Sequence, residues 1–203
     1  MTVIRVLLAE DQHMVRGALA ALLALEPDLE VVAQVGSGDA VVQEAHRSSP
    51  DVALLDIEMP GMDGFMAAEQ LLAELPDCKV LILTTFNRPG YVRRALDVGA
   101  AGFLAKDGPS EQLAAAVRRV HAGELVIDAV MAVSALREGE SPLSPRERDV
   151  MLASIDGSSV VQIARRLRLT EGTTRNYLSA AMRKLNAPNR TIAAERALAK
   201  GWL

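Results

Sequence analysis

The first 123 residues alternate five times between a short apolar run and an amphipathic stretch. The apolar runs are rich in leucine and β-branched residues, which is typical of strands buried on both faces of a sheet. Strands that alternate with helices pair in parallel, so the pattern predicts an α/β fold with a doubly wound, five-stranded parallel sheet. The predicted strands are Ile4–Ala9, Glu30–Gln34, Val52–Asp56, Lys79–Thr84 and Gly102–Ala105, and the predicted helices are Gln12–Leu25, Asp39–Ser48, Gly64–Leu75, Pro89–Val98 and Ser110–Ala122.

The pattern changes after Gly123, which is expected to end the fifth helix. We predict a first domain over residues 1–123, a linker over 124–141 and a second, all-α domain over 142–203. Ser144 opens the second domain as a helix cap, with proline next and glutamate three residues on, which is a strong helix start. The further predicted helices are Val160–Leu167, Thr170–Leu185 and Thr191–Lys200.

Charge is divided unevenly between these two regions. Residues 1–141 hold 11 Lys and Arg against 21 Asp and Glu, a net charge of −10, whereas residues 142–203 hold 11 against 5, a net charge of +6. A small basic domain can neutralise phosphates and release their counterions, whereas an acidic domain is repelled by nucleic acid. The second domain is therefore the candidate for DNA binding.

The chain shows no sign of a membrane segment or of a disulfide. The longest apolar run in the N-terminal region, Ala18–Leu25, is far shorter than the roughly 20 residues that a membrane span needs. The single cysteine excludes an internal disulfide and fits a reducing compartment. We therefore expect a cytoplasmic protein that does not insert into membranes.

Polar residues gather where the predicted strands end. The first strand ends at Glu10 and Asp11, the third at Asp56, the fourth at Thr84 and the fifth at Lys106. These strand ends meet in one crevice of a doubly wound sheet, where three close carboxylates repel one another unless a divalent cation lies among them. The pattern predicts a Mg²⁺ site, in which one carboxylate acts as a nucleophile toward a phosphoryl group.

Four segments of the first domain resemble the receiver domain of two-component response regulators: residues 9–11 (AED), 55–61 (LDIEMPG), 83–85 (LTT) and 102–107 (GFLAKD). The resemblance implies that a sensor histidine kinase phosphorylates Asp56. It implies Asp11 as a direct Mg²⁺ ligand, Glu10 as a ligand through water, and Glu58 as the donor of a backbone carbonyl.

The same resemblance assigns Lys106 to the phosphoryl oxygens. It also makes Thr84 and Phe103 a switch pair, in which the hydroxyl moves to the phosphoryl group and the aromatic ring turns inward. The ring of Phe103 has no hydroxyl, so a switch that depends on a tyrosine hydrogen bond is not available. Asp107 follows the lysine where many receivers have proline.

The second domain resembles the helix-turn-helix of the NarL/FixJ family, which is of the LuxR type. The segments that carry this likeness are 143–151 (LSPRERDVM), 163–167 (IARRL), 170–178 (TEGTTRNYL) and 183–185 (RKL). Within the first domain, residues 83–91 (LTTFNRPGY) are similar to the DesR-like regulators of lipid desaturation. The resemblance implies binding to double-stranded promoter DNA and a homodimer on activation.

Individual DNA contacts are predicted from residue chemistry. Arg175 and Asn176 lie in the N-terminal half of the recognition helix and suit hydrogen bonds to guanine and adenine. Ser179 stands on the same helix, where some members carry lysine, and Val160 and Val161 replace residues that are more often polar. The residues predicted to contact DNA phosphates are Thr173, Arg183, Lys184 and Arg190.

The last predicted helix carries a stripe of residues at helical spacing. Ile192, Ala193, Arg196 and Ala197 fall along one face, which either packs into the core of the domain or forms a dimer interface. The sequence alone leaves both interpretations open.

The expected function is a phosphorylation-dependent transcriptional regulator that is not an enzyme. One alternative is a Mg²⁺-dependent phosphatase of the haloacid dehalogenase type, because Glu58 stands two residues after Asp56 as the second acid does there. The acid pair on an earlier strand, the lack of a substrate cap and the basic helix-turn-helix speak against it. A third possibility is a phosphate sink or adaptor, which would show no salt-dependent DNA binding.

Overall fold

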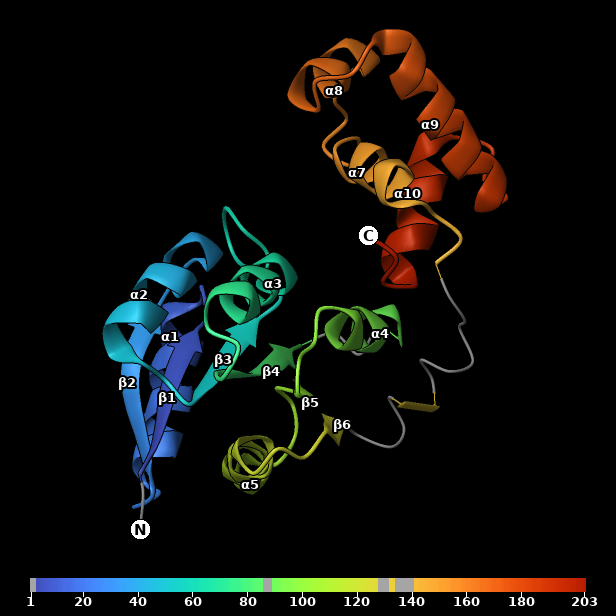
Figure 1. Ribbon diagram of the computed structural model, residues 1–203. Coiled ribbons are helices and arrows are strands. Elements are labelled where there is room, and N and C mark those ends of the chain that lie inside the picture. The colour runs from blue at the N-terminus through green and yellow to red at the C-terminus, as the bar shows by residue number, and fades with distance from the viewer. Residues whose placement is uncertain (1–2, 86–88, 128–131, 134–140) are drawn as a thin grey trace. The chain divides into compact units, whose positions relative to one another are not determined.

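The computed structural model describes residues 3–85, 89–127, 132–133 and 141–203 of the chain. Figure 1 shows an α/β unit and a helical unit, and contacts between residues separate them into one unit built mainly on residues 1–132 and one built mainly on 133–203. The predicted linker, residues 124–141, contains a short strand at its start, and its residues 128–131 and 134–140 lie outside the described part of the chain.

The sheet of the α/β unit has the order β2-β1-β3-β4-β5-β6, and every pair of neighbouring strands is parallel (Figure 1). Four strands have the predicted bounds, and β2 is one residue longer than predicted at each end. Strand β3 is buried at all five positions, as its continuous apolar sequence requires. The strands are β1 (Ile4–Ala9), β2 (Leu29–Val35), β3 (Val52–Asp56), β4 (Lys79–Thr84), β5 (Gly102–Ala105) and β6 (Val126–Ile127).

Strand β6 adds a short edge strand to the five that were predicted, and its residues fall within the predicted linker. After the backbone turns at Gly123, which has a φ of 86°, the chain returns to the sheet edge and pairs Val126 with Gly102. Two residues are too few to carry a strand pattern, so only the parallel pairing with β5 in the folded sheet reveals this strand.

Helices cover both faces of this sheet. Helices α1 and α5 pack together, and Leu23, Leu113 and Val117 from these helices pack against the strands. Helices α2 and α3 contact each other; α2 also contacts β1 and β2, and α3 contacts β3 and β4. The predicted helix from Asp39 begins with a short 3₁₀ turn. The helices are α1 (His13–Ala24), α2 (Val41–Ser48), α3 (Gly64–Glu74), α4 (Pro89–Asp97) and α5 (Ser110–His121), with the 3₁₀ turn η1 (Gly38–Ala40) before α2.

The helical unit contains α7 (Pro145–Leu152), α8 (Val160–Arg166), α9 (Glu171–Lys184) and α10 (Arg190–Ala199). The first two start with complete capping boxes at Ser144 and Ser159, which satisfy backbone N–H groups that a helix start otherwise leaves unpaired. Side chains of all four helices form one apolar core, among them Val150, Ile163 and Leu178.

Residues of the stripe predicted on the last helix, α10, pack into the apolar core of the helical unit. Ala193 and Ala197 are wholly buried in it, and the guanidinium of Arg196 donates to the backbone carbonyls of Leu185 and Asn186. These contacts fix α10 against the end of α9, which favours the core interpretation over an interface.

No helix in the described part of the chain is long and apolar enough to cross a membrane.

Candidate functional site

The carboxyl ends of β1 and β3 bring three acidic side chains together. Glu10 and Asp11 follow β1, and Asp56 ends β3. One carboxylate oxygen from each lies within 4.8 Å of the others. Glu10 is fully buried and Asp56 is 4% exposed, whereas Asp11 is open to solvent. The predicted acidic cluster therefore exists, and one of its three carboxylates is exposed to solvent.

Lys106 bridges the two buried acids from the end of β5. Its Nζ lies 2.8 Å from Oδ1 of Asp56 and 2.5 Å from Oε2 of Glu10, and its side chain is only 7% exposed. Burial raises the pKa of Glu10, and the charge of Asp56 adds to this, while the hydrogen bond from Lys106 acts in the opposite direction. The ammonium of Lys106 thus offsets the repulsion between the carboxylates of Glu10 and Asp56, which folding brings together.

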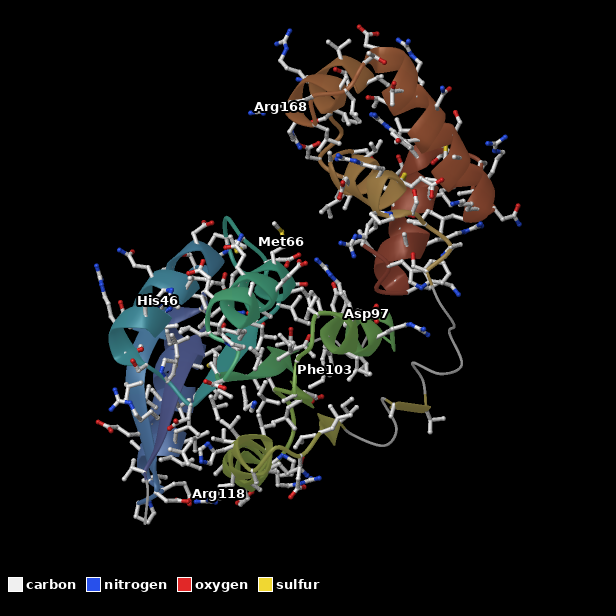
Figure 2. The ribbon with its side chains drawn as sticks, in the orientation of Figure 1. His46, Met66, Asp97, Phe103, Arg118 and Arg168 are labelled. Carbon is white, nitrogen blue, oxygen red and sulfur yellow. The ribbon has the colours of Figure 1, made fainter. Side chains whose placement is uncertain are left out.

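The other predicted residues surround this centre. Thr84 ends β4 with 2% exposure, and its backbone carbonyl accepts from the N–H of Lys106 at 2.7 Å. Phe103 lies in β5 (Figure 2) and is wholly buried, so any movement of its ring takes place within packed side chains. Glu58 is exposed, two residues beyond Asp56.

Gly64 is a further residue of the site, and it was not among the predicted ones. A Cβ atom at this position would lie 1.9 Å from the backbone carbonyl oxygen of Asp56, and the Gly64 N–H donates to the carbonyl of Ile57 at 3.0 Å. Helix α3 therefore starts in direct contact with the backbone of Asp56. The segment 61–64 (GMDG), with Asp63 as the cap of α3, was the available signal.

We expect Gly64→Ala to lower the free energy of unfolding by about 1–3 kcal/mol, because the added methyl group forces the backbone of Asp56 to move. Urea unfolding measures this. The matched control is Gly17→Ala in α1, where a Cβ meets no atom within 4 Å, so stability should rise by up to about 1 kcal/mol. Equal stability of Gly64→Ala and the wild type would contradict the close contact.

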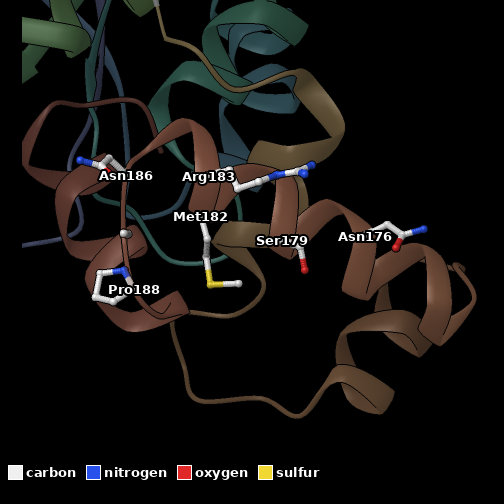
Figure 3. A pocket seen from close by; sticks show the side chains of 7 residues that line it. Asn176, Ser179, Met182, Arg183, Asn186 and Pro188 are labelled. Atoms are coloured by element: carbon white, nitrogen blue, oxygen red, sulfur yellow. The ribbon is translucent and has the colours of Figure 1, made fainter.

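The exposed face of α9 is the candidate nucleic-acid interface. Asn176, Ser179 and Arg183 follow one another along it and line a surface hollow together with Asn186 and Pro188 (Figure 3). Elsewhere on the helix, Arg175 is exposed and pairs with Glu171 at 2.7 Å, and the Thr173 hydroxyl meets that of Thr170 at 2.8 Å. The predicted base-reading residues thus lie on accessible positions of one helix.

Two predicted phosphate contacts have partners inside the helical unit. The ammonium of Lys184 lies 2.6 Å from the Glu147 carboxylate. Burial acts to raise the pKa of Glu147, but hydrogen bonds from Lys184 and Ser144 lower it on balance. Arg190 donates to the carbonyls of Ser158 at 2.6 Å and Gly157 at 3.2 Å. Both cations therefore stabilise the unit, and their contacts to DNA stay predictions.

Comparisons with known proteins match one family to each of the two units. The family described as "Response regulator receiver domain" matches residues 6–118, and the family described as "Bacterial regulatory proteins, luxR family" matches residues 141–197. The transcriptional regulatory protein DesR of Bacillus subtilis is 44% identical over 205 residues, which cover 98% of each chain. The uncharacterized transcriptional regulatory protein YvfU of the same organism is 42% identical and covers 98% of this chain and 100% of its own.

Solved structures of response regulators share the fold of this chain. The response regulator ChrA of a heme-sensing two-component system is 30% identical, with a TM-score of 0.59 and full coverage of both chains. The RcsB response regulator in its complex with DNA shares the fold at a TM-score of 0.67 and 23% identity, covering 98% of this chain and 99% of its own.

Proposed function

The chain belongs to the response regulators that join a receiver domain to a LuxR-family DNA-binding domain, and we propose that phosphorylation of Asp56 switches it into a state that binds promoter DNA. The observation that carries the proposal is the buried Asp56, held by Lys106 within an acidic cluster, in a chain whose second unit is a basic helix-turn-helix. A sensor histidine kinase is the proposed phosphoryl donor.

The chemistry of the site follows from its charges. A carboxylate oxygen of Asp56 attacks phosphorus while the P–N bond to the kinase histidine breaks, and the histidine leaves with the electron pair. Lys106, which lies beside this carboxylate, is placed to neutralise a phosphoryl oxygen. The acceptor is modified once for each phosphoryl group received, so the step is stoichiometric.

The acidic cluster fits a divalent cation. Three carboxylates and one ammonium leave two negative charges, which one Mg²⁺ balances, and hard oxygen ligands are those that Mg²⁺ prefers. We assign Asp11 and Asp56 as direct ligands, Glu10 as a ligand through water and Glu58 through its backbone carbonyl. When bound, Mg²⁺ neutralises charge on the transferring oxygens.

The proposed switch starts at Thr84 and Phe103, which lie on neighbouring strands beside the acceptor. The new charge draws the Thr84 hydroxyl and shifts the packing of Phe103, which changes the surface formed by α4, β5 and α5. A further contact joins the acceptor loop to α4: Asp63, the cap of α3, pairs with Arg94 at 2.9 Å, and Arg94 lies 4.3 Å from the ring centre of Phe65. These links support a transmission of the switch to α4.

In the phosphorylated state two subunits dimerise and place two copies of α9 on paired half-sites of DNA. Arg175 and Asn176 are the proposed base contacts, because both are exposed on α9 and both can form paired hydrogen bonds with base edges.

The match to the LuxR-family domain supports the regulator over the phosphatase and over the adaptor without DNA output, since neither alternative uses a DNA-binding unit. Transcriptional regulators of similar length, including DesR, match almost the whole chain.

The test uses the full chain with a small phosphodonor. DNA fragments retained by the phosphorylated protein are sequenced, and binding to one of them is followed by fluorescence anisotropy. We expect phosphorylation to tighten binding about 5- to 150-fold, the usual range of coupling between two sites. Unchanged affinity would contradict the switch, and steady release of phosphate from ester substrates would favour the phosphatase.

A further inference from the structure

The turn between α8 and α9 contains an arginine in a backbone conformation that arginine rarely adopts. Arg168 has a φ of 55°, in the left-handed region where the Cβ of an L-residue crowds the backbone. Its N–H donates to the carbonyl of Arg165, and the next N–H, that of Leu169, donates to the carbonyl of Ala164. This pair of hydrogen bonds is a Schellman motif, whose left-handed residue is usually glycine.

Among the described residues, four other helices end with this pattern of hydrogen bonds. Three of them use glycine and one uses asparagine at the left-handed position, the two residue types that tolerate it best: Gly99, Gly123, Asn186 and Gly201. Arg168 is the exception among the five. Backbone strain that persists at one position points to a function for the side chain there.

The side chain of Arg168 is directed away from the core. Leu167 and Leu169 on either side of it pack against the apolar core of the helical unit, and Arg168 between them is exposed (Figure 2). Within the described residues its guanidinium has no hydrogen bond or ion pair. By contrast, the guanidinium of Arg166, two residues earlier, forms an ion pair with Asp156 at 2.9 Å.

The position of Arg168 relative to α9 identifies its ligand. Thr170, two residues later, is the N-cap of α9, which is the second helix of the helix-turn-helix. The N-terminal end of that helix enters the major groove, so the turn before it faces the phosphates that border the groove. Glu171 is the acidic residue closest to Arg168 in the sequence, and its carboxylate is already paired with Arg175.

We propose that Arg168 contacts a DNA phosphate, and that the chain keeps an arginine at a strained turn for this contact. The proposal rests on the DNA binding proposed above. Lys184 and Arg190, which are also predicted to contact phosphates, already have partners in the helical unit.

The test separates charge from backbone strain with Arg168→Asn and Arg168→Lys in the full chain. Asparagine tolerates the left-handed conformation, so the melting temperature of Arg168→Asn should equal or exceed that of the wild type. Binding to a short mixed-sequence DNA duplex is measured as salt rises. The slope of log K against log salt should become shallower by about 0.9 for each subunit bound, which is about 3.5-fold less loss of affinity between 50 and 200 mM salt. Arg168→Lys should keep the wild-type slope.

Arg146→Gln is the control, because Arg146 is an exposed arginine of α7 in the same unit and lies outside the helix-turn-helix. Its slope should match that of the wild type. An unchanged slope for Arg168→Asn overturns the inference alone, and so does an equal loss of slope in the Arg146→Gln control. Absence of salt-dependent binding by the wild type overturns the inference together with the proposed DNA binding.

Discussion

Asp56→Asn is expected to abolish the uptake of a phosphoryl group and with it the gain in DNA affinity. The amide of asparagine is not a nucleophile toward phosphorus, and Glu10, the other buried carboxylate of the cluster, is enclosed beneath Lys106. Intact-mass spectrometry after treatment with a small phosphodonor and Mg²⁺ measures the uptake. The affinity of the treated variant for DNA should equal that of the untreated wild type.

Asp77→Asn is the matched control. Asp77 is exposed and lies just before β4, at the amino end of the strand and thus at the opposite edge of the sheet from Asp56. This variant should gain the mass of one phosphoryl group, as the wild type does. A stoichiometric mass gain by Asp56→Asn would place the acceptor elsewhere.

Lys106→Met is expected to lower the free energy of unfolding by about 3–5 kcal/mol at neutral pH in the absence of Mg²⁺. The ammonium is the partner of two buried carboxylates, at 2.5 Å from Glu10 and 2.8 Å from Asp56, and methionine leaves both charges uncompensated. Denaturant unfolding with and without Mg²⁺ measures the loss, and added Mg²⁺ should restore part of it because the cation binds only the folded cluster.

Two further variants test whether uncompensated charge causes the loss of stability in Lys106→Met. Adding Glu10→Gln to Lys106→Met removes one of the uncompensated charges and should recover much of the lost stability. Lys79→Met, at the half-buried start of β4, should stay within about 0.5 kcal/mol of the wild type. A Lys106→Met protein as stable as the wild type would show that the acidic cluster does not need the ammonium for folding.

The bounds of four strands were predictable because each strand is a nearly continuous apolar run that ends at a polar residue. Asp56 and Thr84 mark such ends, and the structure places both there. Strand β6 was not predictable, because two residues carry no periodicity and the strand forms only where β5 offers a free edge.

The meeting of the acidic residues in the candidate site was also predictable from the sequence. Parallel strands present their carboxyl ends at one edge, so acids at these ends had to converge. Their burial could not be predicted from the sequence, because the folded chain encloses Glu10 and leaves Asp11 exposed. The need for glycine at position 64 was hidden as well, since it depends on a backbone carbonyl from a different element.

The sequence by itself determined the two-unit architecture, the acidic strand ends and the basic recognition helix, because these follow from local periodicity, turn residues and charge. The tertiary structure alone decided which charges are available. It paired Lys184 with Glu147 and Arg190 with backbone carbonyls, and it left Arg168 exposed on a strained turn. The reason is that a cation is engaged or free according to neighbours brought to it by folding, and these lie far away along the chain.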